Sequence, residues 1–138
     1  MRMKKLNKRS FVIFVALYLT YTAIYVARLN LSMASPEMKS EGLLSSAQLG
    51  FLGSLFSVIY ACGRLLNGIL SDRVAPWKMI CTGLVLAGIS NLAIGMLPPF
   101  AGMALCWSTN AFAQSMLWSS ILTVVSMLIL VLSPQSII

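Results

Sequence analysis

The sequence contains no histidine and only three acidic residues, Glu37, Glu41 and Asp72. Without histidine or a cluster of acids, it offers neither a set of metal ligands nor an acid–base pair of the kind that enzymes use. Each of its three cysteines lies inside an apolar stretch, so a disulfide framework is not expected. We therefore expect no metal, no cofactor and no enzyme activity.

Charged residues are also scarce: they make up 9% of the sequence, whereas a soluble domain contains about one quarter. Hydrophobic residues make up 59%, and the mean hydropathy is +0.89. This composition is typical of a protein that lies in the lipid bilayer. The net charge of +7 would suit nucleic-acid binding in a soluble protein, but here the basic residues are clustered at one end of the chain. We read that clustering as a signal for membrane orientation, and we expect no nucleic-acid partner.

Four apolar runs can each cross a bilayer, because a span needs about 20 residues. They cover about residues 11–33, 49–70, 79–97 and 101–132, and they are separated by Pro36, by the 72–78 segment and by Pro98-Pro99. The predicted fold is an all-α membrane protein of about four helices, with a basic amino terminus (1–10) and a partial helix bundle (11–138). The fourth run is longer than a bilayer needs unless the helix tilts or breaks.

The basic residues predict the topology. Five of the ten precede the first run, namely Arg2, Lys4, Lys5, Lys8 and Arg9. By the positive-inside rule, this terminus and the 72–78 connection face the cytoplasm, and the 34–46 connection lies outside. We therefore expect a multi-pass protein of the plasma membrane. The alternative is a cleaved signal peptide, which fits poorly because the first run is long and no clear cleavage site follows it.

Three of the predicted helices carry polar side chains on one face, at about 100° per residue. The sets are Tyr18, Tyr21, Tyr25 and Arg28 on the first; Gly53, Ser57, Tyr60, Arg64, Asn67 and Ser71 on the second; and Trp107, Asn110, Gln114 and Trp118 on the fourth. We expect these faces to meet around a wet cavity. The third helix carries the small-residue series Gly83, Ala87, Asn91 and Gly95, which predicts a closely packed scaffold helix on the outside.

Arg28 and Arg64 each lie about 12 Å inside a predicted helix end, at 1.5 Å per residue. One interpretation is that both side chains extend back to the membrane surface. The other is that they face the cavity, where unpaired guanidinium groups would bind an anion such as a phosphate or a carboxylate. The polar neighbours on each face favour the cavity. The candidate substrate site therefore comprises Arg28, Arg64, Tyr21, Tyr25, Tyr60, Asn110 and Gln114.

The segment Gly68-Ile69-Leu70-Ser71-Asp72-Arg73 places an acid–base pair in the tight connection between the second and third runs. Such a pair at a membrane surface, with a small residue one turn earlier, suits the docking and sliding of two helix bundles. Gly68, Asp72 and Arg73 are therefore predicted to form a gating loop. Asp72 has the wrong sign of charge to bind an anion directly.

Three segments carry a family resemblance. Residues 68–73 resemble the loop motif of major facilitator superfamily carriers, and the departure at Ala75-Pro76-Trp77 is similar to the organophosphate:phosphate antiporter branch. Residues 21–30 resemble the first-helix signature of that branch, two tyrosines followed by arginine and asparagine, and Arg64 falls where its glycerol-3-phosphate and hexose-phosphate carriers have a basic residue. Residues 110–118 are similar to its fourth-helix segment, although Ser115 and Leu117 stand where glycines are common.

The resemblance implies a twelve-helix fold of two halves, with an anionic substrate such as an organophosphate or sugar phosphate held between them and moved by alternating access. About four helices are present here, so we expect an amino-terminal fragment that is inactive by itself and whose partner is the missing carboxy-terminal half of the carrier. Two alternatives remain. One is a sugar-phosphate sensor of the same fold, and the other is a small autonomous four-helix membrane protein. The second alternative usually depends on an intramembrane acid, and the predicted spans contain none.

Overall fold

The computed structural model describes residues 8–96 and 98–132, which form four long helices. These are α1 (Lys8–Ser40), α2 (Ser46–Ser71), α3 (Pro76–Gly95) and α4 (Phe100–Leu132). Each of them contains a segment that is long and apolar enough to cross a membrane, so the predicted all-helical fold with four spans is confirmed. The predicted third run ends at Leu97, which lies outside the described residues. The basic amino-terminal segment also falls outside the part whose side chains are described.

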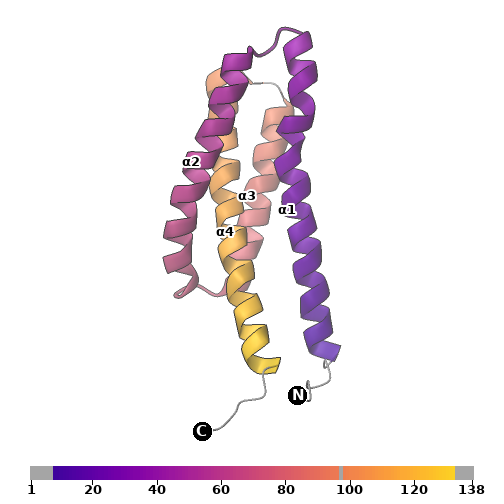
Figure 1. Cartoon of the computed structure of the whole chain (residues 1–138), viewed down its shortest axis with the longest axis vertical. Coiled ribbons are helices and arrows are strands. Elements are labelled where there is room, and N and C mark those ends of the chain that lie inside the picture. Colours follow the sequence, from indigo (N-terminus) through magenta and orange to yellow (C-terminus); the bar gives the residue numbers. More distant parts are fainter. Residues whose placement is uncertain (1–7, 97, 133–138) are drawn as a thin grey trace.

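The helices form an up-and-down bundle (Figure 1). The connections α1–α2 and α3–α4 lie at one end, whereas the α2–α3 connection lies toward the other end, where α1 begins. Both α2 and α3 pack closely on α4, while α1 packs more loosely along α3 and α4. α4 is accordingly the most buried helix of the four.

α2 approaches α4 closely at Gly63. A Cβ atom on Gly63 would overlap the Ser115 Oγ and would lie only 3.3 Å from the Phe112 ring. One turn further along α2, the buried Asn67 Nδ2 donates a hydrogen bond of 2.8 Å to the same Ser115 Oγ. Asn67 was predicted to face a cavity together with Arg64. The structure corrects this, because Asn67 and Ser71 are buried at the end of that polar face, where Asn67 bonds to α4.

α3 approaches α4 through the predicted small-residue series. A Cβ atom on Gly83 would lie 3.0 Å from the Ala113 carbonyl oxygen and 2.8 Å from Leu117 Cγ, and Ala87 is buried one turn later. One member of the series, Asn91, contacts α1 instead. The Asn91 amide accepts a hydrogen bond of 3.2 Å from Asn30 Nδ2, so α3 also contacts α1.

The first helix is longer than predicted. Pro36 was expected to end it, but α1 continues to Ser40. The ending is set by Gly42, whose φ of 71° is the left-handed conformation that glycine adopts readily. The Gly42 N–H donates to the Lys39 carbonyl and the Leu43 N–H donates to the Met38 carbonyl, which together form a Schellman motif. Proline in a helix costs about 3 kcal/mol, but here burial of Met38 stabilises the turn beyond it.

α2 begins after a capping box at Ser45. The Ser45 Oγ accepts a hydrogen bond from the Gln48 N–H, and the Gln48 Oε1 accepts one from the Ser45 N–H. The connection between α1 and α2 is therefore only residues 41–45, shorter than the predicted 34–46 segment.

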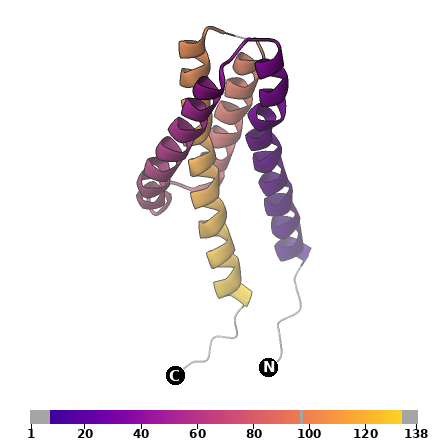
Figure 2. The same ribbon diagram turned by 45° about the horizontal axis from the view of Figure 1, so that its top comes forward.

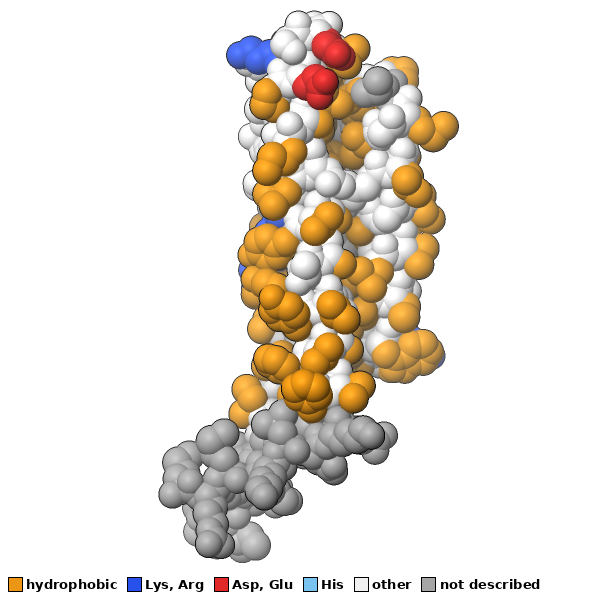
Figure 3. Space-filling model, turned by 90° about the vertical axis from the view of Figure 1, so that its right-hand side faces the viewer, with side chains coloured by type: hydrophobic (Ala, Val, Ile, Leu, Met, Phe, Trp, Pro, Cys, Tyr) orange, Lys and Arg blue, Asp and Glu red, His pale blue; other side chains and the backbone are white. Residues whose placement is uncertain are grey.

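The outer surface is apolar along most of its length. Figure 3 shows hydrophobic side chains covering the helices, with acidic side chains gathered at one end. Two acids lie at this end: Glu37 in the last turns of α1, and Glu41 directly after the helix. Large exposed side chains such as Phe14, Leu19 and Val26 project from α1. This distribution fits a surface that faces lipid.

We predict that Gly83→Ala destabilises the bundle, because the added methyl group would meet a backbone oxygen of α4 that cannot rotate away. Overpacking of this kind costs about 1–3 kcal/mol. The matched control is Gly88→Ala on the same helix, where a Cβ atom would meet nothing within 4 Å. Unfolding in detergent micelles, followed by circular dichroism, should show a loss of stability for Gly83→Ala and no loss for Gly88→Ala. Equal behaviour of the two variants would contradict the close contact between α3 and α4.

Candidate anion-binding site

Arg28 of α1 reaches across to aromatic rings of α2. Its guanidinium carbon lies 4.6 Å from the centre of the Tyr60 ring and 5.2 Å from the centre of the Phe56 ring. Phe56 and Tyr60 are one turn apart, and their rings are stacked, with centres 5.9 Å apart. The side chain of Arg28 is therefore held against α2 and is partly buried.

Arg64 of α2 lies near two rings from different helices. Its guanidinium carbon is 5.9 Å from the centre of the Tyr60 ring and 5.4 Å from that of Trp118 on α4. Tyr60 precedes Arg64 by one helical turn. The Arg64 side chain therefore extends back along α2 and toward α4, and not toward the end of α2 at Ser71.

The two guanidinium groups share the Tyr60 ring. Their carbon atoms lie 4.6 Å (Arg28) and 5.9 Å (Arg64) from its centre, so the two positive charges are close neighbours. Among the described residues, neither forms a hydrogen bond or an ion pair. A cation–π contact contributes about 0.5–2 kcal/mol, less than the roughly 2.5–3.5 kcal/mol that an arginine costs at the centre of a membrane helix. Each guanidinium group has two such contacts, which offset part of this cost but leave its hydrogen-bond donors unused among the described residues.

Two tyrosines extend the aromatic surface along α1. The Tyr21 hydroxyl donates a hydrogen bond of 3.1 Å to the Tyr25 hydroxyl, and their ring centres are 4.8 Å apart. Tyr21 also lies 6.1 Å from Trp118, measured between ring centres, so it joins the rings around Arg64. Tyr18, which was predicted to share their face, is 64% exposed and does not join this group of rings.

Asn110 and Gln114 lie side by side on α4 and are fully buried. Gln114 Nε2 donates a hydrogen bond of 3.2 Å to Asn110 Oδ1. Among the residues that the structure describes, the other two amide atoms of the pair, Asn110 Nδ2 and Gln114 Oε1, have no hydrogen-bond partner, and neither has Trp118 Nε1 one turn further on. Neither amide lines either of the two cavities described below. The structure thus brings the pair together but keeps it closed off, and buried groups without partners usually indicate a place where water or a ligand belongs.

A cavity of about 240 Å³ opens next to Arg28. Its lining combines the guanidinium group with two hydroxyls and two rings: Arg28, Ser32, Gly53, Phe56, Ser57 and Trp107. Gly53 and Ser57 were expected on the polar face of α2. Phe56 was missed because an isolated phenylalanine in an apolar helix carries no polar signal, although its spacing of four residues from Tyr60 could have revealed it.

The predicted gating loop lies at the end of α2 that is remote from the α1–α2 connection (Figure 2). Asp72 and Arg73 are both exposed, and among the described residues they form no ion pair. Around Gly68, a Cβ atom would meet nothing within 4 Å. The loop is held by its backbone, since the Arg73 and Val74 N–H groups donate to the Leu70 carbonyl. Its charged side chains take no part in holding the loop among the described residues.

Several known proteins are similar to this chain. The Escherichia coli membrane sensor protein UhpC is 32% identical over 108 residues, which cover 78% of this chain and 24% of that protein. The Haemophilus influenzae glycerol-3-phosphate transporter is 31% identical over 110 residues, covering 77% and 23%. A probable hexose phosphate transport protein of Chlamydia trachomatis is 29% identical over 106 residues, covering 77% and 23%. No solved structure matches.

The chain thus spans a little under a quarter of the length of these relatives. The family model of the Major Facilitator Superfamily matches residues 13–129, which include α2 and α3 completely and most of α1 and α4. The resemblance predicted from the three sequence segments is confirmed, as is the expectation that the family is not one of enzymes. The chain belongs to the Major Facilitator Superfamily of membrane transporters and is related to its organophosphate, hexose-phosphate and glycerol-3-phosphate carriers.

Proposed function

We propose that this chain supplies one part of the substrate site of a carrier for organic anions such as organophosphates or sugar phosphates, which works by alternating access. The observation that carries the proposal is the pair Arg28 and Arg64, two guanidinium groups that share the Tyr60 ring and have no acid beside them. A guanidinium group donates two parallel hydrogen bonds to a phosphate or carboxylate, which makes it the natural ligand for such a group.

The surrounding residues support this role. The Tyr60 ring contacts both guanidinium groups without neutralising them. Tyr21 and Tyr25 add two hydroxyl groups, and the Tyr21 ring lies near Trp118, which contacts Arg64. Asn110 and Gln114 offer unpartnered amide atoms. We propose that these atoms contact substrate when the α4 face opens. The rest of the site comes from the carboxy-terminal half of a carrier, in keeping with the small share of the relatives that this chain covers.

Sensing of an anion is the second candidate function, and it is favoured by the similarity to membrane sensor protein UhpC. A sensor needs the same binding site but not its exposure to both sides of the membrane. A chimera can distinguish the two functions. In it, residues 13–129 of this chain take the place of the matching segment of the Haemophilus influenzae glycerol-3-phosphate transporter. Uptake by the chimera favours the carrier, and binding without uptake favours the sensor.

We predict that the α2–α3 connection faces the cytoplasm and the α1–α2 connection faces outward. Single cysteines replacing Lys39 or Lys78 in a background without Cys62, Cys81 and Cys106 would be treated with a membrane-impermeant maleimide on intact cells. Only the Lys39 site should react. Reaction at Lys78 from outside would reverse the proposed topology and would remove the argument for a cytoplasmic gating loop.

We predict that Arg64→Gln in the chimera weakens glycerol 3-phosphate binding by about 10- to 100-fold, because a charge-assisted hydrogen bond contributes about 1.5–3 kcal/mol. Arg28→Gln should act similarly. The corresponding lysine variants should recover only part of the affinity, since an ammonium group cannot make the two-pronged contact. Equilibrium dialysis with labelled substrate measures all four variants.

The matched control for these variants is Lys39→Gln, which removes one positive charge at an exposed position far from the Tyr60 ring. It should leave the affinity unchanged. If lysine substitutes freely at both arginine positions and glutamine lowers only the amount of protein produced, then the arginines serve as surface anchors and the anion site is refuted, while the fold stands.

We predict that Asp72→Asn in the chimera slows uptake much more than it weakens substrate binding. The carboxylate is exposed in the loop and repels an anion, so its proposed role is to control how the two halves dock. Comparing the turnover rate with the dissociation constant for the same variant provides the test. Equal losses in both quantities would argue against a gating role for the loop.

A further inference from the structure

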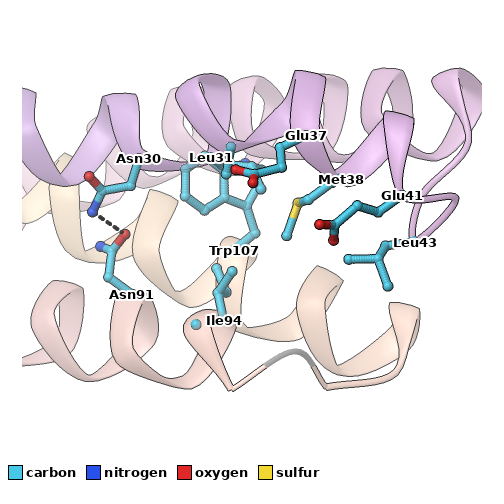
Figure 4. Close-up of a pocket in the computed structure, with 11 residues that line it drawn as sticks. Asn30, Leu31, Glu37, Met38, Glu41, Leu43, Asn91, Ile94 and Trp107 are labelled. Atoms are coloured by element: carbon cyan, nitrogen blue, oxygen red, sulfur yellow. Dashed lines mark hydrogen bonds between the residues drawn. The ribbon is translucent and has the colours of Figure 1, made fainter.

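A second cavity, of about 400 Å³, lies between α1, α3 and α4. We call it the acidic cavity, and Figure 4 shows the residues around it. Its volume falls within the range of about 300–1,000 Å³ that is usual for small-molecule sites. It shares only Trp107 with the cavity beside Arg28.

The acidic cavity has the opposite charge to the arginine site. Two of the three acids of the chain, Glu37 and Glu41, are part of its lining, and no lysine or arginine is. Glu37 is in the last turn of α1 and Glu41 directly follows the helix, and Figure 4 shows both carboxylates on the side that faces the cavity. Among the described residues neither carboxylate has an ion-pair partner. Lys39, which lies between them in the sequence, is exposed and does not line the cavity. Two negative charges at one mouth attract a cation.

The wall below the carboxylates is apolar and aromatic. Leu31, Met38 and Ile94 are buried side chains that face the cavity, and Trp107 closes it from α4. Trp107 is only 5% exposed, and among the described residues its indole makes no hydrogen bond. Its indole therefore offers a large, flat apolar surface to the body of a ligand. At the far end, the Asn30–Asn91 hydrogen bond closes the space.

This lining does not suit a bare metal ion. A small hard cation needs several oxygen ligands, and the described residues contain no group of three or more histidine, cysteine or acidic side chains that could hold one. An organic cation has a large, weakly hydrated charge and an apolar body, so it can meet the carboxylates at the mouth and the buried side chains behind them.

We propose that the acidic cavity is a binding site for a monovalent organic cation with an apolar body, such as a substituted ammonium ion. The cationic group lies by Glu37 and Glu41, and the apolar part lies against Met38, Ile94 and the Trp107 ring. This site is separate from the anion site, and it does not depend on whether Arg28 and Arg64 bind substrate.

The probe is benzyltrimethylammonium, and the comparison compound is neopentylbenzene, which has the same shape without the charge. The whole chain would be placed in phosphatidylcholine nanodiscs, with Trp77 and Trp118 changed to phenylalanine so that Trp107 alone reports binding by its fluorescence. Empty nanodiscs correct for partition of both compounds into lipid. We expect saturable binding of the cation and much weaker binding of the neutral compound.

The double variant Glu37→Gln/Glu41→Gln keeps the size of both exposed side chains and removes their charge. It should weaken binding of the cation at least about tenfold, as expected for the loss of charge-assisted contacts, and should leave the neutral compound unaffected. The matched control Asp72→Asn removes an acid at the α2–α3 connection and should change nothing. The proposal is overturned if wild-type protein does not bind the cation, if both compounds bind equally, or if the glutamine and Asp72→Asn variants behave alike. Calcium binding without binding of the organic cation would also overturn it.

Discussion

The close contact of α4 with its two neighbours is the constraint on which the rest of the structure depends. In a membrane, an apolar side chain gains little free energy when it moves from lipid to a contact with another helix, so helices associate through close packing and hydrogen bonds. Gly63 and Gly83 let α2 and α3 approach α4 from two sides, and the Asn67–Ser115 hydrogen bond fixes the position of α2 along it. The serine at 115, where related carriers are expected to have glycine, is thus an acceptor that the buried asparagine needs.

That packing places the aromatic rings of the candidate site. Trp107 meets Phe56 with ring centres 5.0 Å apart, and Trp118 lies near both Arg64 and Tyr21. α4 therefore carries rings toward both cavities, while α2 supplies Tyr60 between the two arginines. Because rings rather than carboxylates surround the guanidinium groups, the positive charge remains available to a ligand. An acidic partner would have stabilised the empty site and competed with an anion.

Much of this arrangement could be predicted from sequence. The four apolar runs follow from hydropathy, and the small-residue series of α3 follows from helical periodicity. Periodicity also groups Tyr21 and Arg28 on α1 and Tyr60 and Arg64 on α2, whereas the expectation that the two faces meet came from their polarity. The end of α1 was predicted wrongly because Pro36 is a strong local signal, whereas the ending depends on Gly42 and on burial of Met38. The burial of Asn67 could not be predicted from one helix. It depends on the rotation of α2 about its axis, which the contact at Gly63 determines.

The helices differ in length, and this difference has a consequence for the membrane around them. α3 has 20 residues and α4 has 33, which correspond to about 30 Å and about 50 Å at 1.5 Å per residue. Figures 1 and 2 both show the far end of α4 passing beyond the α2–α3 connection. That connection carries Asp72 and Arg73, which require water, whereas Met127 and Leu130 on the far part of α4 are exposed and apolar. A flat bilayer of uniform thickness cannot satisfy both, so either the hydrocarbon boundary varies in height around this bundle or another part of a carrier covers the far part of α4.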